Sequence, residues 1–367
     1  MMTLRLLFVG AVLLGLHLFP VARAQLGPQQ MLTSAESTVT QPSTSEAEDV
    51  RSTSDMLVGC YQCWPISDWC GVMGRCPDYQ LDWAFIYPSA WADLSNVEGG
   101  YPIIANFAMM DDTICTTFTA AANGDCNNIY DWIVDNVLVP YASHIYAIVI
   151  NTEWIGGWSY YSPVCDPGQS GGCPSDFNSL TPEKWIAGTR NLISRIKAAP
   201  ALANVKIEVD SPVNDIQVPY WPGDDIVDMA GEDMYFLSQW FPTSQQAWIY
   251  SCGNSVPPCT STSTLGYIAE FAQKHAKPML IPQWCDTFTD GYIIPRFAAW
   301  MVASNVVANS YWNSNDDVDT GCLLARDGRG NSTPKRLQSY INAFGNTSYT
   351  GTYWPSYLAL PDPNPYQ

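Results

Sequence analysis

Eight short apolar runs recur along this 367-residue chain, and their spacing limits the possible fold more than any other feature of the sequence. Each run is rich in β-forming residues and lacks polar alternation, so each is expected to be a strand that is buried on both faces. Longer polar or amphipathic segments separate the runs. The eight predicted strands are residues 56–61, 83–87, 102–108, 145–150, 205–209, 226–231, 278–282 and 305–311.

Amphipathic segments between these runs have the pattern of helices. Strands that alternate with helices form a parallel sheet with the helices on its outside. Eight repeats favour a closed (β/α)8 TIM barrel over an open doubly wound sheet, and the chain has no glycine-rich nucleotide-binding turn. The clearest predicted helices are residues 127–141, 182–199, 263–275, 292–303 and 334–344.

The composition divides the chain into three parts. In residues 1–24, Arg5 precedes an apolar run and Ala22-Arg23-Ala24 supplies small residues for cleavage, which is typical of a secretory signal peptide. Residues 25–54 are rich in Ser, Thr, Glu and Gln, so we expect a disordered linker. Residues 55–367 would form the disulfide-rich barrel of a secreted, extracellular protein.

The charge of the chain limits its partners. A formal net charge of −19 at pH 7 repels nucleic acid and anionic membranes, so neither is an expected partner. Only 14% of the residues are charged, which suits an extracellular protein, and we expect one that lives at low pH. We expect a monomer that uses no cofactor.

Twelve cysteines in an exported chain indicate disulfides rather than metal ligands. His144 and His275 are the only histidines outside the signal peptide, and neither has the spacing of a zinc finger, so no metal site is expected. Both precede predicted strands, at the end of a barrel that serves stability rather than catalysis. Proximity along the chain predicts the pairs Cys115–Cys126, Cys165–Cys173, Cys252–Cys259 and Cys285–Cys322, and leaves open the pairing among Cys60, Cys63, Cys70 and Cys76.

The fourth predicted strand ends at a single acidic residue. The apolar run 145–150 stops at Asn151-Thr152-Glu153, and a loop rich in Trp, Gly and Tyr follows, including Trp158. The carboxyl ends of the strands are the active end of a parallel barrel, so Glu153 is the first candidate for a catalytic group. The alternative is a structural acid that is paired inside the barrel.

Polar and aromatic residues follow the other predicted strands, and together they predict a mouth lined by carboxylates and rimmed by aromatic rings. Such a mouth suits carbohydrate, because sugar faces stack on aromatic rings and two acids can flank a glycosidic bond. Trp158, Trp284 and Trp312, which belong to this predicted mouth, could equally be packing residues. Glu232 is expected to point the opposite way from Asp233, the next residue on the strand, and to pack behind the barrel. The candidate substrate-binding residues are Trp158, Asp210, Asp233, Tyr235, Trp284 and Trp312.

Three sequence blocks resemble glycoside hydrolase family 26, the β-mannanase family within the clan of retaining (β/α)8 glycosidases. IVINTEWIGGW at 148–158 is similar to its fourth-strand motif, YWPGDDIVDMAGEDMYF at 220–236 to its sixth-strand block, and KPMLIPQW at 277–284 to its seventh-strand block. The resemblance implies that Glu153 is the general acid/base and that the Tyr235 hydroxyl orients the nucleophile.

Two departures from the family pattern concern the chemistry. The family has Arg and His upstream of the acid/base, whereas this chain has apolar residues and Thr152. The place of the nucleophilic Glu is taken by Gln283, which cannot form a glycosyl ester. Asp286 could supply the second carboxylate, or Asp210 or Asp233 could act as base to a water in an inverting arrangement.

The sequence therefore predicts a secreted glycoside hydrolase that cleaves a polysaccharide, such as a β-mannan or a related β-glycan. Glu153, Gln283 and Asp286 are the candidate catalytic residues, with Glu153 as the proton donor. The alternative function is a catalytically silent carbohydrate-binding or cell-wall scaffold protein that kept the barrel without the nucleophile.

Overall fold

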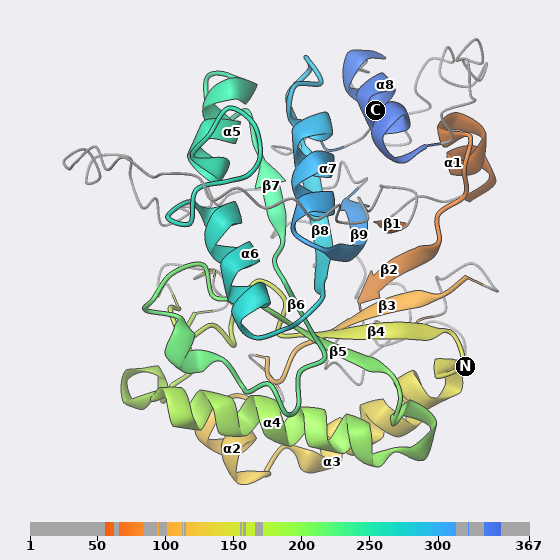
Figure 1. Ribbon diagram of the computed structural model, residues 1–367. Coiled ribbons are helices and arrows are strands. Elements are labelled where there is room, and N and C mark those ends of the chain that lie inside the picture. The colour runs from red at the N-terminus through yellow and green to blue at the C-terminus, as the bar shows by residue number, and fades with distance from the viewer. Residues whose placement is uncertain are drawn as a thin grey trace, which may run out of the picture.

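The computed structural model describes residues 56–61, 66–83, 94, 101–111, 113, 115–154, 156, 159–165, 172–312, 322 and 334–345. Its strands are parallel and form a closed barrel, as the sequence predicted (Figure 1). β6 and β7 both pair with β8, so together they form the sixth of eight barrel strands. The strands are β1 Leu57–Tyr61, β2 Tyr79–Trp83, β3 Ile103–Phe107, β4 Ile145–Ile150, β5 Lys206–Asp210, β6 Met229–Gly231, β7 Met234–Phe236, β8 Met279–Asp286 and β9 Val306–Trp312.

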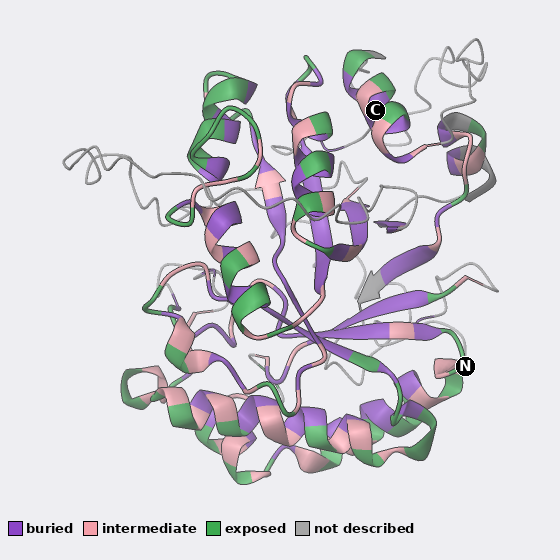
Figure 2. Cartoon of the chain, in the orientation of Figure 1, coloured by how far each residue is buried: buried purple, intermediate pink, exposed green. Residues whose placement is uncertain are grey.

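Helices cover the outside of the barrel. Figure 2 shows that they turn buried residues toward the sheet and exposed residues toward solvent. The five predicted helices are confirmed, whereas α1, α2 and α5 are short and were not predicted. The helices are α1 Ile66–Met73, α2 Phe118–Asn123, α3 Asn127–Ile133, α4 Pro182–Ala198, α5 Ser244–Cys252, α6 Thr264–Lys274, α7 Ile293–Ala303 and α8 Pro334–Phe344, with a π turn at Val134–Leu138 and 3-10 turns at Val139–Tyr141, Phe177–Ser179, Pro200–Leu202 and Val218–Tyr220.

The start of α4 shows how the sequence sets a helix boundary. The side chain of Thr181 accepts a hydrogen bond from the Lys184 N–H, and Pro182 occupies the first helical position. A side-chain cap satisfies one of the free N–H groups of the first turn, and proline there loses no hydrogen bond. α4 then packs against α2 and α3 on one side of the barrel.

The second strand lies earlier in the chain than predicted. The sequence predicts residues 83–87, but β2 spans Tyr79–Trp83, and residues 84–87 lie outside the described residues. Gln80 and Asp82 alternate with Tyr79 and Leu81 in β2, so the strand has no continuous apolar run that the pattern could detect.

Two apolar layers form the core, one on each face of the sheet. The alternation of a strand divides them: in β4, Ala147 and Val149 face the barrel interior, whereas Ile148 and Ile150 face the helices. The helix-facing layer is much the larger. The interior layer contains Tyr79, Leu81, Ile104, Ala147, Val149, Met229, Leu280 and Ala308.

Disulfides close several loops around the barrel. The four predicted pairs, Cys115–Cys126, Cys165–Cys173, Cys252–Cys259 and Cys285–Cys322, are all formed. Cys70 pairs with Cys76, which resolves part of the connectivity that the sequence left open. Each short loop contributes on the order of 2–3 kcal/mol by restricting the unfolded chain.

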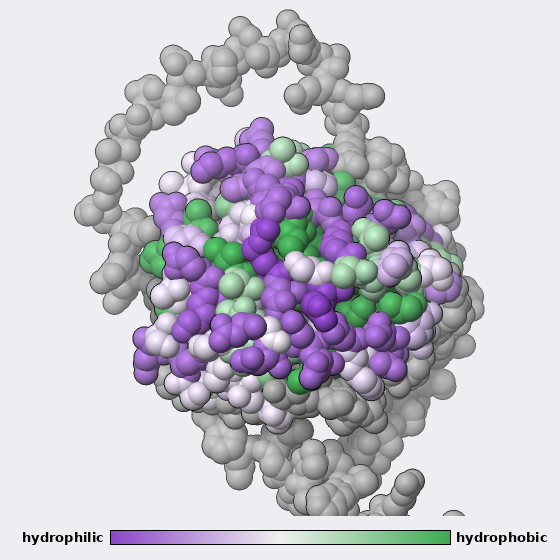
Figure 3. Space-filling model, turned by 90° about the horizontal axis from the view of Figure 1, so that it is seen from below, coloured by the Kyte–Doolittle hydropathy of each residue, from purple (hydrophilic) through white to green (hydrophobic). Residues whose placement is uncertain are grey.

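The outer surface is mainly polar. Figure 3 views the molecule from below, toward the side that α2, α3 and α4 cover, and shows a largely hydrophilic face with scattered apolar side chains. Of the helices that the structure describes, none is both long enough and apolar enough to cross a membrane.

Gly231 allows β6 to approach β8. A Cβ atom added at this position would lie 1.6 Å from the main-chain oxygen of Leu280 and 3.0 Å from the Glu208 carboxylate. The nearest obstacle belongs to the backbone of a central strand, which cannot move aside without breaking the pairing of the sheet. Glycine is therefore required where the sixth and seventh barrel strands meet.

We predict that Gly231→Ala lowers the free energy of unfolding by about 3 kcal/mol, as overpacking in a core does. Denaturant unfolding under oxidising conditions measures the loss. Gly71→Ala is the matched control, because a Cβ on this exposed residue of α1 would meet nothing within 4 Å. The control should be neutral or raise stability by about 0.5–1 kcal/mol. Equal stability of the two variants would contradict the steric argument.

Candidate active site

A polar layer lies above the apolar interior of the barrel. Asn106 of β3 follows Ile104 on the inner face, Ser310 of β9 follows Ala308, and β5 contributes Glu208 and Asp210. All four polar side chains are buried. The barrel interior thus changes from apolar to polar toward the carboxyl ends of the strands, which is where the predicted site residues gather.

The residues after β4 form a tight turn that presents Glu153. Asn151 and Glu153 both have left-handed backbone conformations, with φ of 57° and 55°. The side-chain oxygen of Asn151 accepts from the Met109 N–H at 2.8 Å, and its side-chain amide donates to the Thr189 hydroxyl at 3.1 Å. Asparagine tolerates this conformation better than most residues, so its type here suits the turn.

Asp210 fixes the turn to the neighbouring strand. The main-chain N–H of Glu153 donates to the Asp210 carboxylate at 2.5 Å, and the indole N–H of Trp154 donates to the Asp210 carbonyl oxygen at 2.8 Å. Trp154 is fully buried against Trp185, so the turn is held by packing as well as by hydrogen bonds. The position of Glu153 is therefore set by its backbone.

Asp233 lies between the fourth and seventh barrel strands. Its Oδ2 atom accepts from the Thr152 hydroxyl at 3.0 Å, and its carboxylate also accepts a hydrogen bond from the main-chain N–H of Gln283. The Tyr235 hydroxyl donates to the Gln283 side-chain oxygen Oε1 at 2.6 Å. The structure thus brings Glu153, Asp210, Asp233, Tyr235 and Gln283 together at the carboxyl end of the barrel.

A β-bulge turns Gln283 toward this group. Leu280 faces the interior of the barrel, so strict alternation would send Trp284 inward and Gln283 outward. Instead, Ile281 pairs with Asn309 and Trp284 with Tyr311, so that β8 advances three residues while β9 advances two. The extra residue reverses the alternation, as bulges beside active sites often do.

Buried acids dominate the electrostatics of the group. Burial raises the pKa of Asp210 to about 7, although the hydrogen bond from the Glu153 N–H opposes this shift. Burial, and then the charges of neighbouring acids, hold the pKa values of Glu208, Glu232 and Asp233 well above their ordinary range. Because each ionised carboxyl raises the pKa of its neighbours, the group resists losing all of its protons at once.

Glu208, Asp210, Glu232 and Asp233, together with Glu153, are called the acidic group. None of the described residues whose charges shift the pKa values of these four buried acids is basic. The charges acting on Glu208, Asp210, Glu232 and Asp233 come from one another and from Glu153, and none comes from Lys, Arg or His. Burial, and then the charges of the other acids in the group, raise the pKa of Glu232. The alternation of the strand, by contrast, predicts that Glu232 packs behind the barrel. No grouping of described His, Cys, Asp and Glu side chains is arranged to hold a metal ion.

Two predicted residues lie elsewhere. Trp284 is fully buried on the helix side of β8, where its ring stacks on Tyr340 and meets Phe297 edge-on. The expectation that Trp284 lines the mouth is therefore corrected, because the bulge turns it toward α7 and α8. Asp286 follows on the same side, and its carboxylate accepts from the Phe288 N–H at 2.8 Å.

Asp286 is electrically separate from the acidic group. Burial raises its pKa to about 7, and the charges that act on it belong to Arg336 and Asp290 rather than to Glu153 or Asp210. Its placement therefore does not suit a second carboxylate opposite Glu153.

The remaining two tryptophans differ in what the structure describes. Trp312 ends β9 at the carboxyl end of the barrel and is half-buried against the core. Trp158 lies outside the described residues.

Sequence reasoning missed several members of the polar layer. Glu208 lies two residues before Asp210 on one strand, so the period of two could have identified it as a residue of the same face. Asn106 and Ser310 sit inside strands whose pattern is otherwise apolar. Thr152 stands out in the sequence only as a departure from a family pattern, and its contact with Asp233 could not be foreseen.

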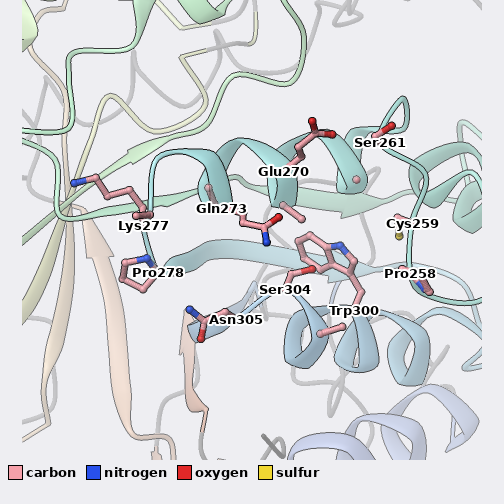
Figure 4. A pocket seen from close by; sticks show the side chains of 15 residues that line it. Pro258, Cys259, Ser261, Glu270, Gln273, Lys277, Pro278, Trp300, Ser304 and Asn305 are labelled. Carbon is pink, nitrogen blue, oxygen red and sulfur yellow. The ribbon is translucent and has the colours of Figure 1, made fainter. Parts of the chain in front are cut away.

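A separate pocket of about 840 Å³ lies on the outside of the barrel, between α6 and α7. Gln273 of α6 and Trp300 of α7 extend toward one another across it, and Pro278 and Asn305, which precede β8 and β9, border it (Figure 4). Glu270 is its one carboxylate. The pocket therefore lacks the paired acids of the group at the carboxyl end.

The two histidines have no part in the acidic group. His144 is exposed and directly precedes β4. His275 caps α6, stacks on Phe271 and contacts the Asp224 carboxylate at 2.8 Å. Both lie before strands, as predicted for the stabilising end of the barrel.

Comparison with solved structures shows the fold. A β-mannanase of glycoside hydrolase family 26 from Bacteroides ovatus matches with a TM-score of 0.54 and 13% identity, over 79% of this chain and 89% of that chain. A ruminal family 26 endo-β-1,4-mannanase matches with a TM-score of 0.50 and 12% identity, over 80% of this chain and 64% of that chain. This chain thus spans less than two thirds of the ruminal enzyme.

These likenesses show that the chain shares the (β/α)8 fold of the two mannanases. No family model and no curated protein sequence matches the chain. The likeness to the two solved structures supports the resemblance of the three sequence blocks at the level of fold.

The raised pKa values predict that stability is greatest in acid. A carboxyl whose pKa is higher in the folded state stabilises the fold below its unfolded pKa, and this contribution is lost as the pH rises through the folded value. For Asp210 and Asp286 the window runs from about 4 to about 7. The loss is about 1.4 kcal/mol per pH unit for each such group.

Denaturant unfolding at a series of pH values tests this prediction. The free energy of unfolding should fall as the pH rises from 4 to 7. Asp286→Asn should make the fall shallower, because it removes one titrating group that is remote from the others. A free energy that rises over this window would contradict the prediction.

Proposed function

We propose that the protein is a secreted glycoside hydrolase that cleaves a β-linked polysaccharide, a β-mannan or a related β-glycan. The observation that carries the proposal is that Asp210 holds the Glu153 backbone at the carboxyl end of the barrel, where Asp233 bonds to the neighbouring Thr152 and to the Gln283 main chain. Disulfides and the predicted signal peptide support an extracellular location.

Glu153 is proposed as the general acid that protonates the leaving oxygen. Asp233 is proposed as the second carboxyl group, because it lies between the fourth and seventh barrel strands, where a group acting on the opposite side of a bound sugar is needed. Asp210 positions Glu153 through its backbone. The surrounding acids would stabilise the positive charge that develops on the sugar ring in the transition state.

The sugar itself would meet hydroxyls and aromatic rings around this pair. Tyr235 is half-buried at the mouth and can contact the ligand as well as Gln283. Trp312 and Trp158 are proposed as platforms for sugar faces, the first from the end of β9 and the second from the sequence that follows Glu153. A neutral polysaccharide suits a site in which the described charges are all acidic.

We predict that Glu153→Gln abolishes sugar release and leaves the thermal transition nearly unchanged, because the amide is isosteric and cannot donate a proton to the leaving group. Reducing-end assays over a panel of β-glycans between pH 3 and 7 measure the release. Glu270→Gln, an exposed substitution on α6, is the control and should retain full activity. Activity that survives Glu153→Gln would refute the assignment.

A second pair of variants separates the candidate carboxyls. Asp233→Asn should lower kcat by at least ~100-fold, since it removes the group opposite Glu153. Asp286→Asn should leave kcat within about twofold, because its carboxyl faces α8 and not the mouth. The reverse result would assign the second carboxylate to Asp286, and loss of activity only in Asp210→Asn would assign it to Asp210.

Gln283 favours a second candidate function, a catalytically silent carbohydrate-binding protein. An amide at the place of the nucleophile cannot form the covalent intermediate of a retaining glycosidase. Binding titrations beside the release assays distinguish the two functions. Glycan binding without release at any pH would favour the binding protein.

A further inference from the structure

The Gln283 side-chain amide is hydrogen-bonded through its oxygen, whereas its nitrogen has no partner among the described residues. Its side-chain oxygen Oε1 accepts from the Tyr235 hydroxyl at 2.6 Å, which fixes the amide so that the NH2 group points the other way. This nitrogen, Nε2, is buried and finds no hydrogen-bond partner among the described residues. Leaving a buried donor unpaired costs about 1–3 kcal/mol, so the site is built for an acceptor that arrives with a ligand.

The neighbouring residue, Asp233, has an acceptor oxygen without a side-chain partner among the described residues. Asp233 uses Oδ2 for the Thr152 hydroxyl, and its carboxylate accepts from the main-chain N–H of the same Gln283. Its second oxygen, Oδ1, is buried and has no side-chain partner within the described part of the chain. The unpaired donor and the unpaired acceptor therefore belong to two residues that are joined by the hydrogen bond from the Gln283 main-chain N–H to the Asp233 carboxylate.

This pair is complementary to a secondary amide. A carbonyl oxygen would accept from Gln283 Nε2 while the amide N–H donates to Asp233 Oδ1. We propose that Gln283 and Asp233 bind the 2-acetamido group of a β-linked amino sugar, so that the substrate replaces the missing nucleophile. The inference rests on the proposed glycosidase function and narrows its substrate to glycans of N-acetylated amino sugars.

Other ligand groups fit the pair less well. A carboxylate would satisfy the Gln283 donor, but it would add negative charge beside Glu153, Asp210 and Asp233. A single hydroxyl could bond to both atoms, yet it would supply no group to attack the anomeric carbon. An acetamido group is neutral, satisfies both atoms and carries a nucleophilic oxygen.

The reaction then needs no carboxylate at position 283. The acetamido carbonyl oxygen forms a bond to C1 while the glycosidic C1–O bond breaks, and Glu153 gives its proton to the leaving oxygen. The product is a cyclic oxazolinium ion. Water then attacks C1, gives a proton to Glu153 and reopens the ring, which restores the acetamido group and completes hydrolysis with retention.

The charge of this intermediate matches the site. The oxazolinium is a cation whose N–H would face Asp233, and the acidic group has no countercharge among the described residues that shift its pKa values. Fixed acids around a developing positive charge stabilise it without reorganisation. Attack from the face opposite the leaving group requires a trans arrangement, so the ring would have the gluco or galacto configuration and not the manno configuration.

Binding of two matched trisaccharides tests the inference. Chitotriose and cellotriose are both β-1,4-linked gluco-configured sugars, and they differ in the acetamido or hydroxyl group at C2. Titration calorimetry uses the full-length protein carrying Glu153→Gln, so that neither sugar is cleaved. We expect chitotriose to bind at least about tenfold more tightly, as one additional satisfied hydrogen-bonding pair allows. Equal affinities, tighter binding of cellotriose or no binding of either sugar would overturn the inference.

Gln283→Glu in the same background identifies the donor. It replaces Nε2 by an oxygen that cannot donate when ionised, so the preference for chitotriose should fall to about twofold or less. Gln273→Glu on α6 makes the same change of amide to carboxylate at an exposed position in the separate pocket, so it is the matched control and should keep the full preference. Both proteins must show the thermal transition of the parent. A preference that survives in a folded Gln283→Glu protein would overturn the assignment.

Sugar release by the wild-type protein separates this inference from the function on which it rests. Preference for chitotriose without any release would refute the glycosidase function and leave the amide site standing. Release from glycans without acetamido groups, together with equal binding of the two trisaccharides, would refute the amide site and leave the glycosidase function. Inhibition of release by an N-acetylglucosamine-derived thiazoline, a stable mimic of the oxazolinium, would support both.

Discussion

The hydrogen bond from the Glu153 main chain to Asp210 is the contact on which the arrangement of the site depends. It joins the turn after β4 to the end of β5, and the indole of Trp154 reinforces it from the same turn. This hydrogen bond holds the backbone of Glu153 and so fixes where that residue lies relative to β5. The cost is a buried acid, since Asp210 must sit in the barrel interior beside Glu208. The raised pKa values of the neighbouring acids follow from that burial.

The molecule places its charges unequally. Several of its basic residues pair with acids near the surface, as Arg190 does with Asp225 and Arg195 with Asp131. Exposed pairs of this kind contribute little stability. Among the described residues whose charges shift the pKa values of Glu208, Asp210, Glu232 and Asp233, none is basic. The charge of these buried acids is therefore expensive to create and is most useful when a cation forms beside them. The predicted stability in acid and the proposed stabilisation of a positively charged transition state both follow from this one arrangement.

Much of the barrel could be predicted because its signal is local. Runs of apolar residues located β1, β3, β4, β5, β8 and β9, and amphipathic spacing located five helices. Glu153, Asp210 and Asp233 could be placed together because parallel strands share an active end. The rest depends on features without a local signal. The bulge that sends Gln283 inward and Trp284 outward is a matter of pairing between β8 and β9, and β2 carries polar residues that hide it from any search for apolar runs.

The extra residue in β8 also bears on how such a site can change in evolution. Between Ile281 and Trp284 the strand holds one residue more than its partner β9. Losing a single residue there would restore strict alternation along β8. The Trp284 indole would then face the mouth, and the Gln283 amide would face the core. A change in chain length, without any substitution of a polar residue, would then change which side chains line the mouth. Comparisons that align β8 without a gap would overlook such a history.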